Sequence, residues 1–181
     1  MNFKKTPLDG LIIVEPKVYH DDRGYFFESF NQSDFEKNEI GLNFVQDNQS
    51  YSHKGVLRGL HFQAPPFEQG KFVRVARGAV LDIAVDVRRK SKTFGTHFAI
   101  ELNDRDHQML WIPPGFAHGF VTLEDHTIFS YKCTGFYHQP SERGIRYDDP
   151  DLNIRWMEKK PTLSQKDLEL MSWKQFVDLN E

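Results

Sequence analysis

Residues 58–63 read Arg-Gly-Leu-His-Phe-Gln, and residues 113–118 read Pro-Pro-Gly-Phe-Ala-His. Between these two clusters, the odd positions of residues 79–88 are Ala, Leu, Ile, Val and Val, whereas the even positions include Asp82, Asp86 and Arg88. This period-two alternation is typical of a β-strand whose two faces meet different surroundings. Further short runs of the same kind occupy residues 96–102, 108–112, 119–123 and 127–133, with Gly, Pro, Asn and Asp between them. Evenly spaced short strands predict an antiparallel sandwich or barrel.

Two segments outside these runs carry helical signals. A capping-box pattern at residues 33–36 predicts a short helix over residues 34–40, with Gly41 as its C-terminal stop. A second helix is predicted over residues 165–179, with Ser164 as its cap. No repeat, linker or low-complexity segment interrupts the chain. The sequence therefore predicts an all-β barrel with small flanking helices.

The two clusters quoted first resemble the two halves of the cupin barrel motif, so we expect an all-β, cupin-type β-barrel (jelly roll) that forms one domain over residues 1–181. A metal-binding cupin shows His-x-His with a nearby Glu in the first half and a third His in the second. Here Gln63 stands in place of the second His. Imidazole nitrogen binds a first-row metal far better than a neutral amide oxygen does. We therefore expect no bound metal, which leaves His61 free to titrate as a proton-transfer group.

Charge and composition exclude several classes of partner. The formal net charge is -3, so the sequence predicts no general attraction to nucleic acid or to an anionic membrane. Cys133 is the only cysteine, which excludes an internal disulfide and fits a reducing compartment. The first apolar run, residues 11–14, is too short for a signal peptide or a membrane span. We expect a cytoplasmic protein whose 16 phenylalanines fill a barrel interior and a subunit interface.

His61 is the leading candidate for chemistry. Strand alternation places it on one face with Gly59 and Gln63, while Leu60 and Phe62 point the other way. The alternative is a buried histidine whose ring is satisfied by a backbone carbonyl. The polar residues Arg58, Gln63, Lys71 and Arg74 crowd the same two strands, however. A barrel interior so rich in polar side chains is costly unless it binds a ligand, which favours a functional role.

Asp167 lies three residues after Ser164, where an acidic side chain caps a helix N-terminus. The functional alternative makes it the carboxylate that orients His61 and raises its basicity. Tyr131 is either a core residue or a general acid. Lys71 is either a surface charge or the cation that stabilises an oxyanion. The local sequence leaves each pair of alternatives open.

Ordered motifs along nearly the whole chain carry a resemblance to a known family. They are Asp22-Arg23-Gly24-Tyr25-Phe26-Phe27-Glu28, Val45-Gln46-Asp47-Asn48-Gln49-Ser50, Gly55-Val56-Leu57-Arg58-Gly59-Leu60-His61, Gly70-Lys71-Phe72-Val73-Arg74-Val75, Ser91-Lys92-Thr93-Phe94-Gly95, Gly115-Phe116-Ala117-His118-Gly119-Phe120, Tyr131-Lys132, Glu142 and Leu163-Ser164-Gln165-Lys166-Asp167. With these motifs the chain resembles the dTDP-4-dehydrorhamnose 3,5-epimerase family.

The resemblance implies a metal-free and cofactor-free homodimer that acts on a dTDP-4-keto-6-deoxyhexose. Members of the family invert carbons 3 and 5 on the route to dTDP-L-rhamnose. The matched positions imply His61 as the base with Asp167 as its support, Tyr131 as the acid on the opposite face of the sugar, and Lys71 at the enolate oxygen. The positions that resemble substrate-binding residues of the family are Arg23, Glu28, Gln46, Asp47, Asn48, Arg58, Lys71, His118, Glu142 and Lys166.

Elementary chemistry agrees with these implied roles. A C–H bond beside a ketone is acidic only because the carbanion spreads onto oxygen, so a cationic donor at that oxygen lowers the barrier. Inversion then needs one base and a separately placed acid. Guanidinium groups bind phosphate oxygens bidentately, so a protein of net negative charge can hold a diphosphate locally. The absence of a Gly-x-Gly-x-x-Gly loop fits a reaction that needs no nicotinamide.

Three other functions stay open on sequence grounds. The first is a mono-epimerase of the same fold that inverts carbon 3 or carbon 5 alone, because every motif would survive in it. The second is a metal-dependent cupin oxygenase, against which Gln63 argues. The third is a non-catalytic cupin that binds sugar nucleotides, which would not need His61, Tyr131, Asp167 and Lys71 together.

Overall fold

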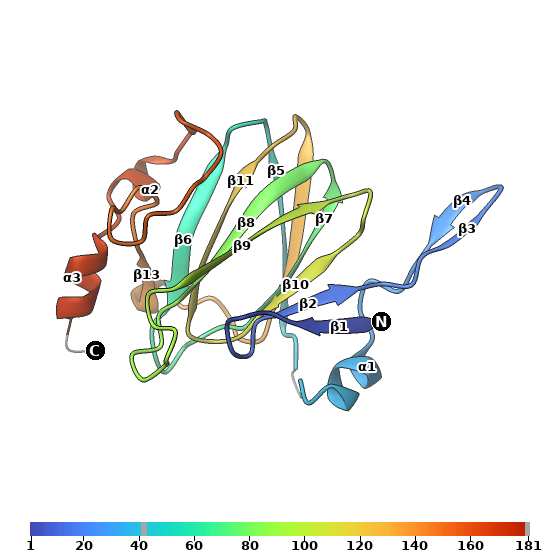
Figure 1. The fold of residues 1–181 in the computed structure, drawn as a ribbon, viewed down its shortest axis with the longest axis horizontal. Helices are drawn as coiled ribbons and strands as arrows, with labels where there is room; N and C mark the ends of the chain where they lie inside the picture. Colours follow the sequence, from blue (N-terminus) through green and yellow to red (C-terminus); the bar gives the residue numbers. More distant parts are fainter. Residues whose placement is uncertain (41–42, 180–181) are drawn as a thin grey trace.

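Two antiparallel sheets form the body of the protein in the computed structural model, which describes residues 1–40 and 43–179. The six-stranded sheet has the order β1 (Asn2–Lys5), β2 (Ile12–Glu15), β10 (Met109–Ile112), β7 (Lys71–Arg77), β12 (Thr127–Cys133) and β5 (Gln46–Ser52). The five-stranded sheet has the order β13 (Glu142–Gly144), β6 (Leu57–Gln63), β11 (Phe116–Thr122), β8 (Ala79–Asp86) and β9 (His97–Asn103). Figure 1 shows the sheets as the facing walls of a barrel. The predicted all-β, jelly-roll architecture with small helices is confirmed.

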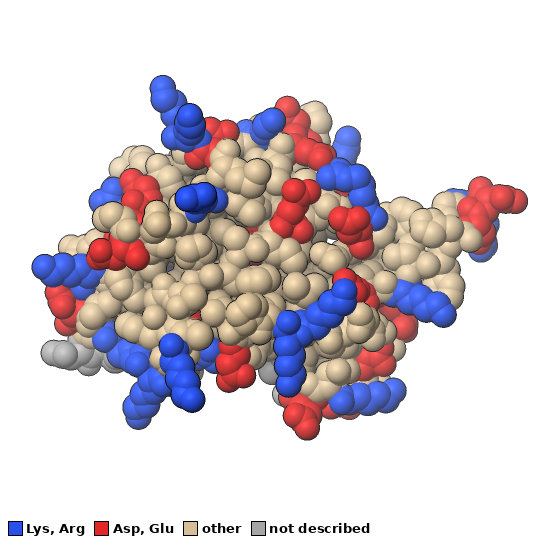
Figure 2. Space-filling view, in the orientation of Figure 1, with Lys and Arg blue, Asp and Glu red and all other residues tan. Residues whose placement is uncertain are grey.

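A two-stranded hairpin, β3 (Tyr19–Asp21) and β4 (Gly24–Phe26), stands apart from both sheets. Figure 1 shows it protruding from one end of the molecule, while the C-terminal helices lie at the opposite end. In the space-filling view, basic and acidic side chains are intermixed on the face shown (Figure 2). That face therefore presents no broad surface of a single charge sign.

The helices are shorter than the sequence predicts. α1 (Gln32–Lys37) is capped by Asn31, whose side chain accepts a hydrogen bond from the backbone N–H of Ser33. The capping box at residues 33–36 was therefore wrong, because an asparagine two residues earlier takes the capping position. The proposed stop, Gly41, lies outside the described residues.

The C-terminal helix predicted over residues 165–179 is two helices, α2 (Gln165–Leu168) and α3 (Trp173–Asp178), each capped by a serine. Between them Met171 forms a bridge with Ile145, and its carbonyl accepts a hydrogen bond from the backbone N–H of Arg146. Pairing with the segment around Ile145 requires an extended backbone at Met171, so the helix is interrupted there. A single-turn 3₁₀ helix (Gln139–Ser141) precedes β13.

Both faces of β8 are buried, so its alternating pattern reflects two different buried environments. Leu81, Ile83 and Val85 pack against the C-terminal segment on the outer face of the five-stranded sheet. The even positions face the barrel interior, where Val80 and Ala84 join the core between the sheets. The outer face of the six-stranded sheet is covered separately, by a cluster that includes aromatic side chains around α1. No helix among the described residues is long and apolar enough to span a membrane.

Asp86 explains the motif Ser91-Lys92-Thr93-Phe94-Gly95. Its fully buried carboxylate accepts hydrogen bonds from the hydroxyls of Ser91 and Thr93, both at 2.6 Å, and from the guanidinium of Arg88. Burial raises the pKa of Asp86, but these donors outweigh it and lower the pKa to about 2. The motif thus fixes the turn between β8 and β9.

We expect this carboxylate to make stability depend on pH. Because its folded pKa of about 2 lies below the ordinary value of 3.8, its contribution is present above about pH 4 and is lost as the pH falls towards 2. At pH 7, Asp86→Asn should lower the free energy of unfolding by about 2 kcal/mol, measured by denaturant unfolding. The exposed Asp151→Asn is the control. An Asp86→Asn variant as stable as the control at pH 7 would contradict the assignment.

Candidate active site

His61 and Asp167 meet in the wall of the barrel. His61 lies on β6, and its Nε2 is 2.7 Å from Oδ1 of Asp167, which comes from α2. The two atoms are close enough for an ion pair, but the geometry of the contact is not that of a regular hydrogen bond. The Asp167 side chain is only 4% exposed, whereas that of His61 is 27% exposed. The histidine is therefore open to a ligand, and the carboxylate is sealed behind it.

Asp167 also belongs to the first turn of α2, so its two interpretations are compatible. Its Oδ2 accepts a hydrogen bond from the hydroxyl of Ser164, which in turn accepts one from the backbone N–H of Asp167. Oδ1 receives a longer hydrogen bond from the backbone N–H of Gly59. Burial raises the pKa of Asp167, but the contacts from His61 and Ser164 outweigh it and the net shift is downward. An ionised carboxylate beside His61 favours the protonated imidazole once it has accepted a proton.

A register irregularity brings Arg58 to the same cavity as His61. On β11, His118 pairs with His61 and Phe120 pairs with Arg58, so three steps on β6 oppose two on β11. Gly59 absorbs the difference with a φ of +128°, and a Cβ there would lie 2.5 Å from Cα of Gly119. Strict alternation would point Arg58 and His61 to opposite faces. Only a glycine permits this backbone approach.

Two adjoining cavities share Asn48, His61, Lys71 and Tyr131. One has a volume of about 300 Å³ and is also lined by Gln46, Phe62, Gln63, Gln69, Cys133, Tyr137 and Glu142. The other, of about 400 Å³, is also lined by Gln49, Ser50, Arg58, His118, Phe120, Ser164, Lys166 and Asp167. Seven of the ten predicted substrate-binding positions therefore line this double cavity: Gln46, Asn48, Arg58, Lys71, His118, Glu142 and Lys166.

Tyr131 and Lys71 face His61 from the opposite wall. Burial raises the pKa of the Tyr131 hydroxyl, which therefore stays protonated near neutral pH and can donate. The Nζ of Lys71 donates a hydrogen bond of 3.4 Å to the backbone carbonyl of His61. Burial lowers the pKa of Lys71, and a negative charge on a ligand beside it would favour the charged ammonium.

The rim of the cavity is held by polar contacts between three segments. Glu142 accepts hydrogen bonds from Lys166 on α2 and from the hydroxyl of Tyr137, the latter at 2.6 Å. Burial raises the pKa of Glu142, but its contacts with Lys166 and Tyr137 outweigh it and the pKa is lowered. The Gln46 side chain accepts from the backbone N–H of Tyr137. The loop after β12 is thereby tied to β5, β13 and α2.

Gln63 has a different task from that of a metal ligand. Its amide donates to the carbonyls of Phe67 and Phe136 and accepts from the backbone N–H of His138, so it connects two loops at the rim. No group of three or more His, Cys, Asp or Glu residues in the described part of the chain could hold a metal ion. The metal-free interpretation stays a prediction.

The other three predicted substrate-binding positions, Arg23, Glu28 and Asp47, lie away from this cavity, and so does Arg74. Arg23 is at the hairpin tip, paired with Asp21. Glu28, also predicted to bind substrate, lies in the segment before α1 and accepts a hydrogen bond from Asn31. Asp47 and Arg74 point to the outer face of the six-stranded sheet, because alternation on β5 and β7 directs Asn48 and Lys71 inward instead.

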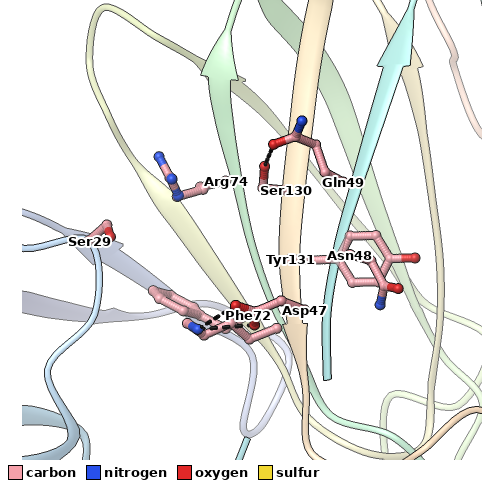
Figure 3. Close-up of a pocket in the computed structure, with 9 residues that line it drawn as sticks. Ser29, Asp47, Asn48, Gln49, Phe72, Arg74, Ser130 and Tyr131 are labelled. Carbon is pink, nitrogen blue, oxygen red and sulfur yellow. Dashed lines mark hydrogen bonds and ion pairs between the residues drawn. The ribbon is translucent and has the colours of Figure 1, made fainter. Parts of the chain in front are cut away.

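Figure 3 shows the hollow on that outer face. Arg74, Gln49 and Ser130 lie on one side of the strands, whereas the side chains of Asn48 and Tyr131 point away from Arg74. Asp47 forms an ion pair with Lys132 there, with Nζ to Oδ1 at 3.0 Å. The hollow has a volume of about 380 Å³ and is lined by neither His61 nor Asp167, although Asn48 and Tyr131 border both it and the double cavity.

Comparison with known proteins agrees with this geometry. A sequence profile of the dTDP-4-dehydrorhamnose 3,5-epimerase family matches residues 5–175. The dTDP-4-dehydrorhamnose 3,5-epimerase of Methanothermobacter thermautotrophicus is 50% identical over 175 residues, which cover 95% of this chain and 92% of that protein. The chain belongs to the dTDP-4-dehydrorhamnose 3,5-epimerase family.

Solved structures of related epimerases superpose closely. The 3,5-epimerase RmlC of Legionella pneumophila, in complex with dTDP-4-keto-L-rhamnose, is 47% identical with a TM-score of 0.91, over 94% of this chain and 92% of that one. ChmJ of Streptomyces bikiniensis, a 3'-monoepimerase in complex with dTDP-quinovose, is 31% identical with a TM-score of 0.87, over 92% and 85%. The fold is therefore shared by epimerases of both kinds.

Tyr137, Cys133 and Asp82 at this epimerase-family site were not predicted from the sequence. Tyr137 and Cys133 line the cavity, yet neither belonged to a pattern that indicated a site role. Asp82 is fully buried beside His118, with Oδ2 2.9 Å from Nε2. Its position among the even residues of β8 was the available signal, because an acidic side chain on a strand with two buried faces needs a partner inside.

We expect the His61 and Asp167 pair to carry the epimerase activity. His61→Asn should lower kcat by at least the ~10²–10⁴ that general-base catalysis contributes, with fold and dTDP binding retained. Asp167→Asn should impair kcat strongly with a smaller effect on dTDP affinity, because the imidazolium loses its carboxylate. Steady-state kinetics, calorimetric dTDP binding and thermal unfolding check both variants.

Glu169→Gln, an exposed change close by in the chain, is the control for Asp167→Asn. If Asp167→Asn lowered only the unfolding temperature and left kcat intact, the carboxylate would be a helix-capping residue alone.

Proposed function

We propose that the protein converts dTDP-4-dehydro-6-deoxy-D-glucose to dTDP-4-dehydro-L-rhamnose by epimerisation at carbons 3 and 5, in dTDP-L-rhamnose biosynthesis. The observation that carries the proposal is one cavity that joins a carboxylate-supported histidine, a protonated tyrosine and a buried lysine. The dTDP-4-keto-L-rhamnose complex of the Legionella relative supports the substrate class.

Each of the three groups has a separate task in the reaction. Neutral His61 removes the proton from the carbon beside the ketone, and Asp167, 2.7 Å away, stabilises the imidazolium that forms. The electron pair moves onto the ketone oxygen, where the ammonium of Lys71 stabilises the negative charge. Tyr131 donates its proton to the opposite face of the carbon. Solvent then reprotonates Tyr131 and takes the proton from His61, so each cycle ends with both groups restored.

The remaining side chains fit a sugar diphosphate. Arg58 and Lys166 bring two cations to the cavity that holds His61. The guanidinium of Arg58 contacts the Ser52 hydroxyl at 3.3 Å and has no carboxylate partner among the described contacts, so it is available to an anion. Asn48 on β5 offers an amide to the sugar hydroxyls. These assignments rest on position in the cavity together with family membership.

A homodimer would account for Arg23, a predicted substrate-binding residue that lies outside the cavity of its own chain. The hairpin of β3 and β4 exposes Tyr25 and Phe26 and carries Arg23 at its tip, away from the cavity. Exposed aromatic side chains and arginine are typical of protein interfaces. We propose that the hairpin packs on a second copy and brings Arg23 to that copy's substrate.

The cytoplasm is the proposed location. Cys133 is free and buried, and burial raises the pKa of its thiol. A protein with one unpaired thiol and no disulfide among its described residues has the cysteine usage of a reducing compartment.

We expect two inactive variants to restore activity when mixed, if the hairpin crosses between copies. Arg23→Ala and His61→Asn each disable a site, but a hybrid dimer would hold one intact site made from both chains. Random exchange should recover about a quarter of wild-type activity, since half of the dimers are hybrids with one working site each. Exchange under mild denaturant followed by an epimerase assay measures it. No recovery despite exchange would place Arg23 outside the partner's site.

Deuterium uptake in heavy water distinguishes the 3,5-epimerase from a mono-epimerase such as ChmJ. The wild-type protein should incorporate deuterium at carbons 3 and 5, because each carbanion is quenched by a solvent-exchanged proton. Tyr131→Phe should keep exchange with retained configuration while inversion falls sharply, since His61 still removes the proton. NMR of the recovered sugar reports both. Label at one carbon would convert the assignment to a mono-epimerase, and undiminished inversion in Tyr131→Phe would remove Tyr131 from the mechanism.

A further inference from the structure

A second histidine and carboxylate pair lies behind the first. His118 on β11 is the register partner of His61 on β6, and its Nε2 is 2.9 Å from Oδ2 of Asp82 on β8. The side chains of His118 and Asp82 are 6% and 0% exposed. The histidines of two imidazole–carboxylate pairs therefore occupy neighbouring strands, one of them partly exposed and the other almost fully buried.

The surroundings of His118 oppose a positive charge on its ring. Burial is the main cause that lowers the pKa of His118, and the charges of Lys71 on β7 and His61 on β6 act in the same direction. Asp82 on β8 acts the other way, but the net shift is downward. The rings of Phe120 and Phe129 pack beside it, with centroids 6.3 Å and 6.0 Å from that of His118. His118 is thus held as a neutral imidazole.

A neutral imidazole has one N–H, and its partners decide which nitrogen carries it. An ionised carboxylate only accepts hydrogen bonds, so the contact with Asp82 places the proton on Nε2. No described residue forms a hydrogen bond with Nδ1 of His118, and His118 lines the cavity of about 400 Å³. Nδ1 is therefore the ring atom left for a ligand, and it carries a lone pair.

We propose that Asp82 is a positioning residue that locks His118 in the neutral Nε2–H tautomer, so that Nδ1 accepts a hydrogen bond from a hydroxyl of the bound hexulose. His118 then selects for a sugar that presents a hydroxyl donor there, and Lys71 is left as the cationic donor to the enolate oxygen. The inference deepens the proposed function and rests on it for the identity of the ligand.

The cost of Asp82 to the core supports a role beyond packing. Its Oδ1 is buried and has no hydrogen-bond partner among the described residues. A buried carboxylate oxygen without a partner destabilises a fold, and an apolar residue would fill the same space at less cost. Asp86 differs, because hydrogen bonds engage both of its oxygens. Asp82 engages one oxygen, and that oxygen contacts His118.

The tautomer is measured directly by ¹⁵N NMR of the histidine-labelled protein, with the His118 signals assigned by their loss in His118→Gln. In the wild type we expect a protonated Nε2, an unprotonated Nδ1, and no titration of this ring from about pH 5.5 to 8.5. In Asp82→Asn the side-chain amide donates to Nε2, so the proton should move to Nδ1 and the two shifts should exchange. A wild-type ring that is protonated on Nδ1, or that titrates near neutral pH, would overturn the proposal.

Kinetics of the same variant test the consequence. Asp82→Asn turns Nδ1 into a donor facing a hydroxyl, so KM for the sugar nucleotide should rise about tenfold or more, while Kd for dTDP, which lacks the hexulose, stays within twofold. Asp86→Asn is the matched control on the same strand and face, and it should change stability without changing the tautomer or KM. An Asp82→Asn variant that loses only stability would show a purely structural role.

The tautomer of His118 and the epimerase activity are tested separately. The tautomer is read from the resting protein, whether or not it turns over any substrate. Absence of epimerase activity in the wild type would remove the proposed function while leaving the Asp82 and His118 assignment to the NMR result.

Discussion

The contact between His61 and Asp167 sets a constraint that the rest of the molecule meets. His61 belongs to the barrel wall, but the Asp167 carboxylate that it contacts comes from α2, outside the barrel. The C-terminal segment must therefore pack on the outer face of the five-stranded sheet, where Trp156 and Phe176 join Leu57 and the outward residues of β8. Burial of that apolar surface holds a four-residue helix that would not form alone. Apolar packing over the outer face thus holds Oδ1 of Asp167 within hydrogen-bond distance of Nε2 of His61.

The same constraint explains the glycine beside the histidine. Asp167 approaches β6 where Gly59 lacks a side chain, and the backbone N–H of Gly59 donates to the carboxylate. On its other side Gly59 lies against Gly119 of β11. The irregular register at this point turns Arg58 into the cavity. One local feature of β6 therefore sets the neighbours of the base on two strands and one helix.

Sequence patterns predicted the parts of this structure that depend on period-two alternation. β8, β12 and β10 were found nearly to the residue, because their inward and outward side chains differ in kind or in partner. The errors came where tertiary contacts compete with local signals. Asn31 replaced the predicted cap of α1, and pairing at Met171 split the C-terminal helix. Alternation on β7 places Arg74 and Lys71 on opposite faces. The sequence-based grouping of polar residues on two strands did not apply this rule and put both residues at one site.

The two histidine and carboxylate pairs show why residue type alone does not define a role. Both pairs place Nε2 within 3 Å of an aspartate, on adjacent strands of one sheet. The first is open to the cavity, so its imidazole can gain and lose a proton as a base must. The second is almost fully buried, and burial together with the charge of Lys71 on β7 lowers the pKa of His118. The division of tasks follows from depth in the barrel, which no spacing of histidines in the sequence encodes.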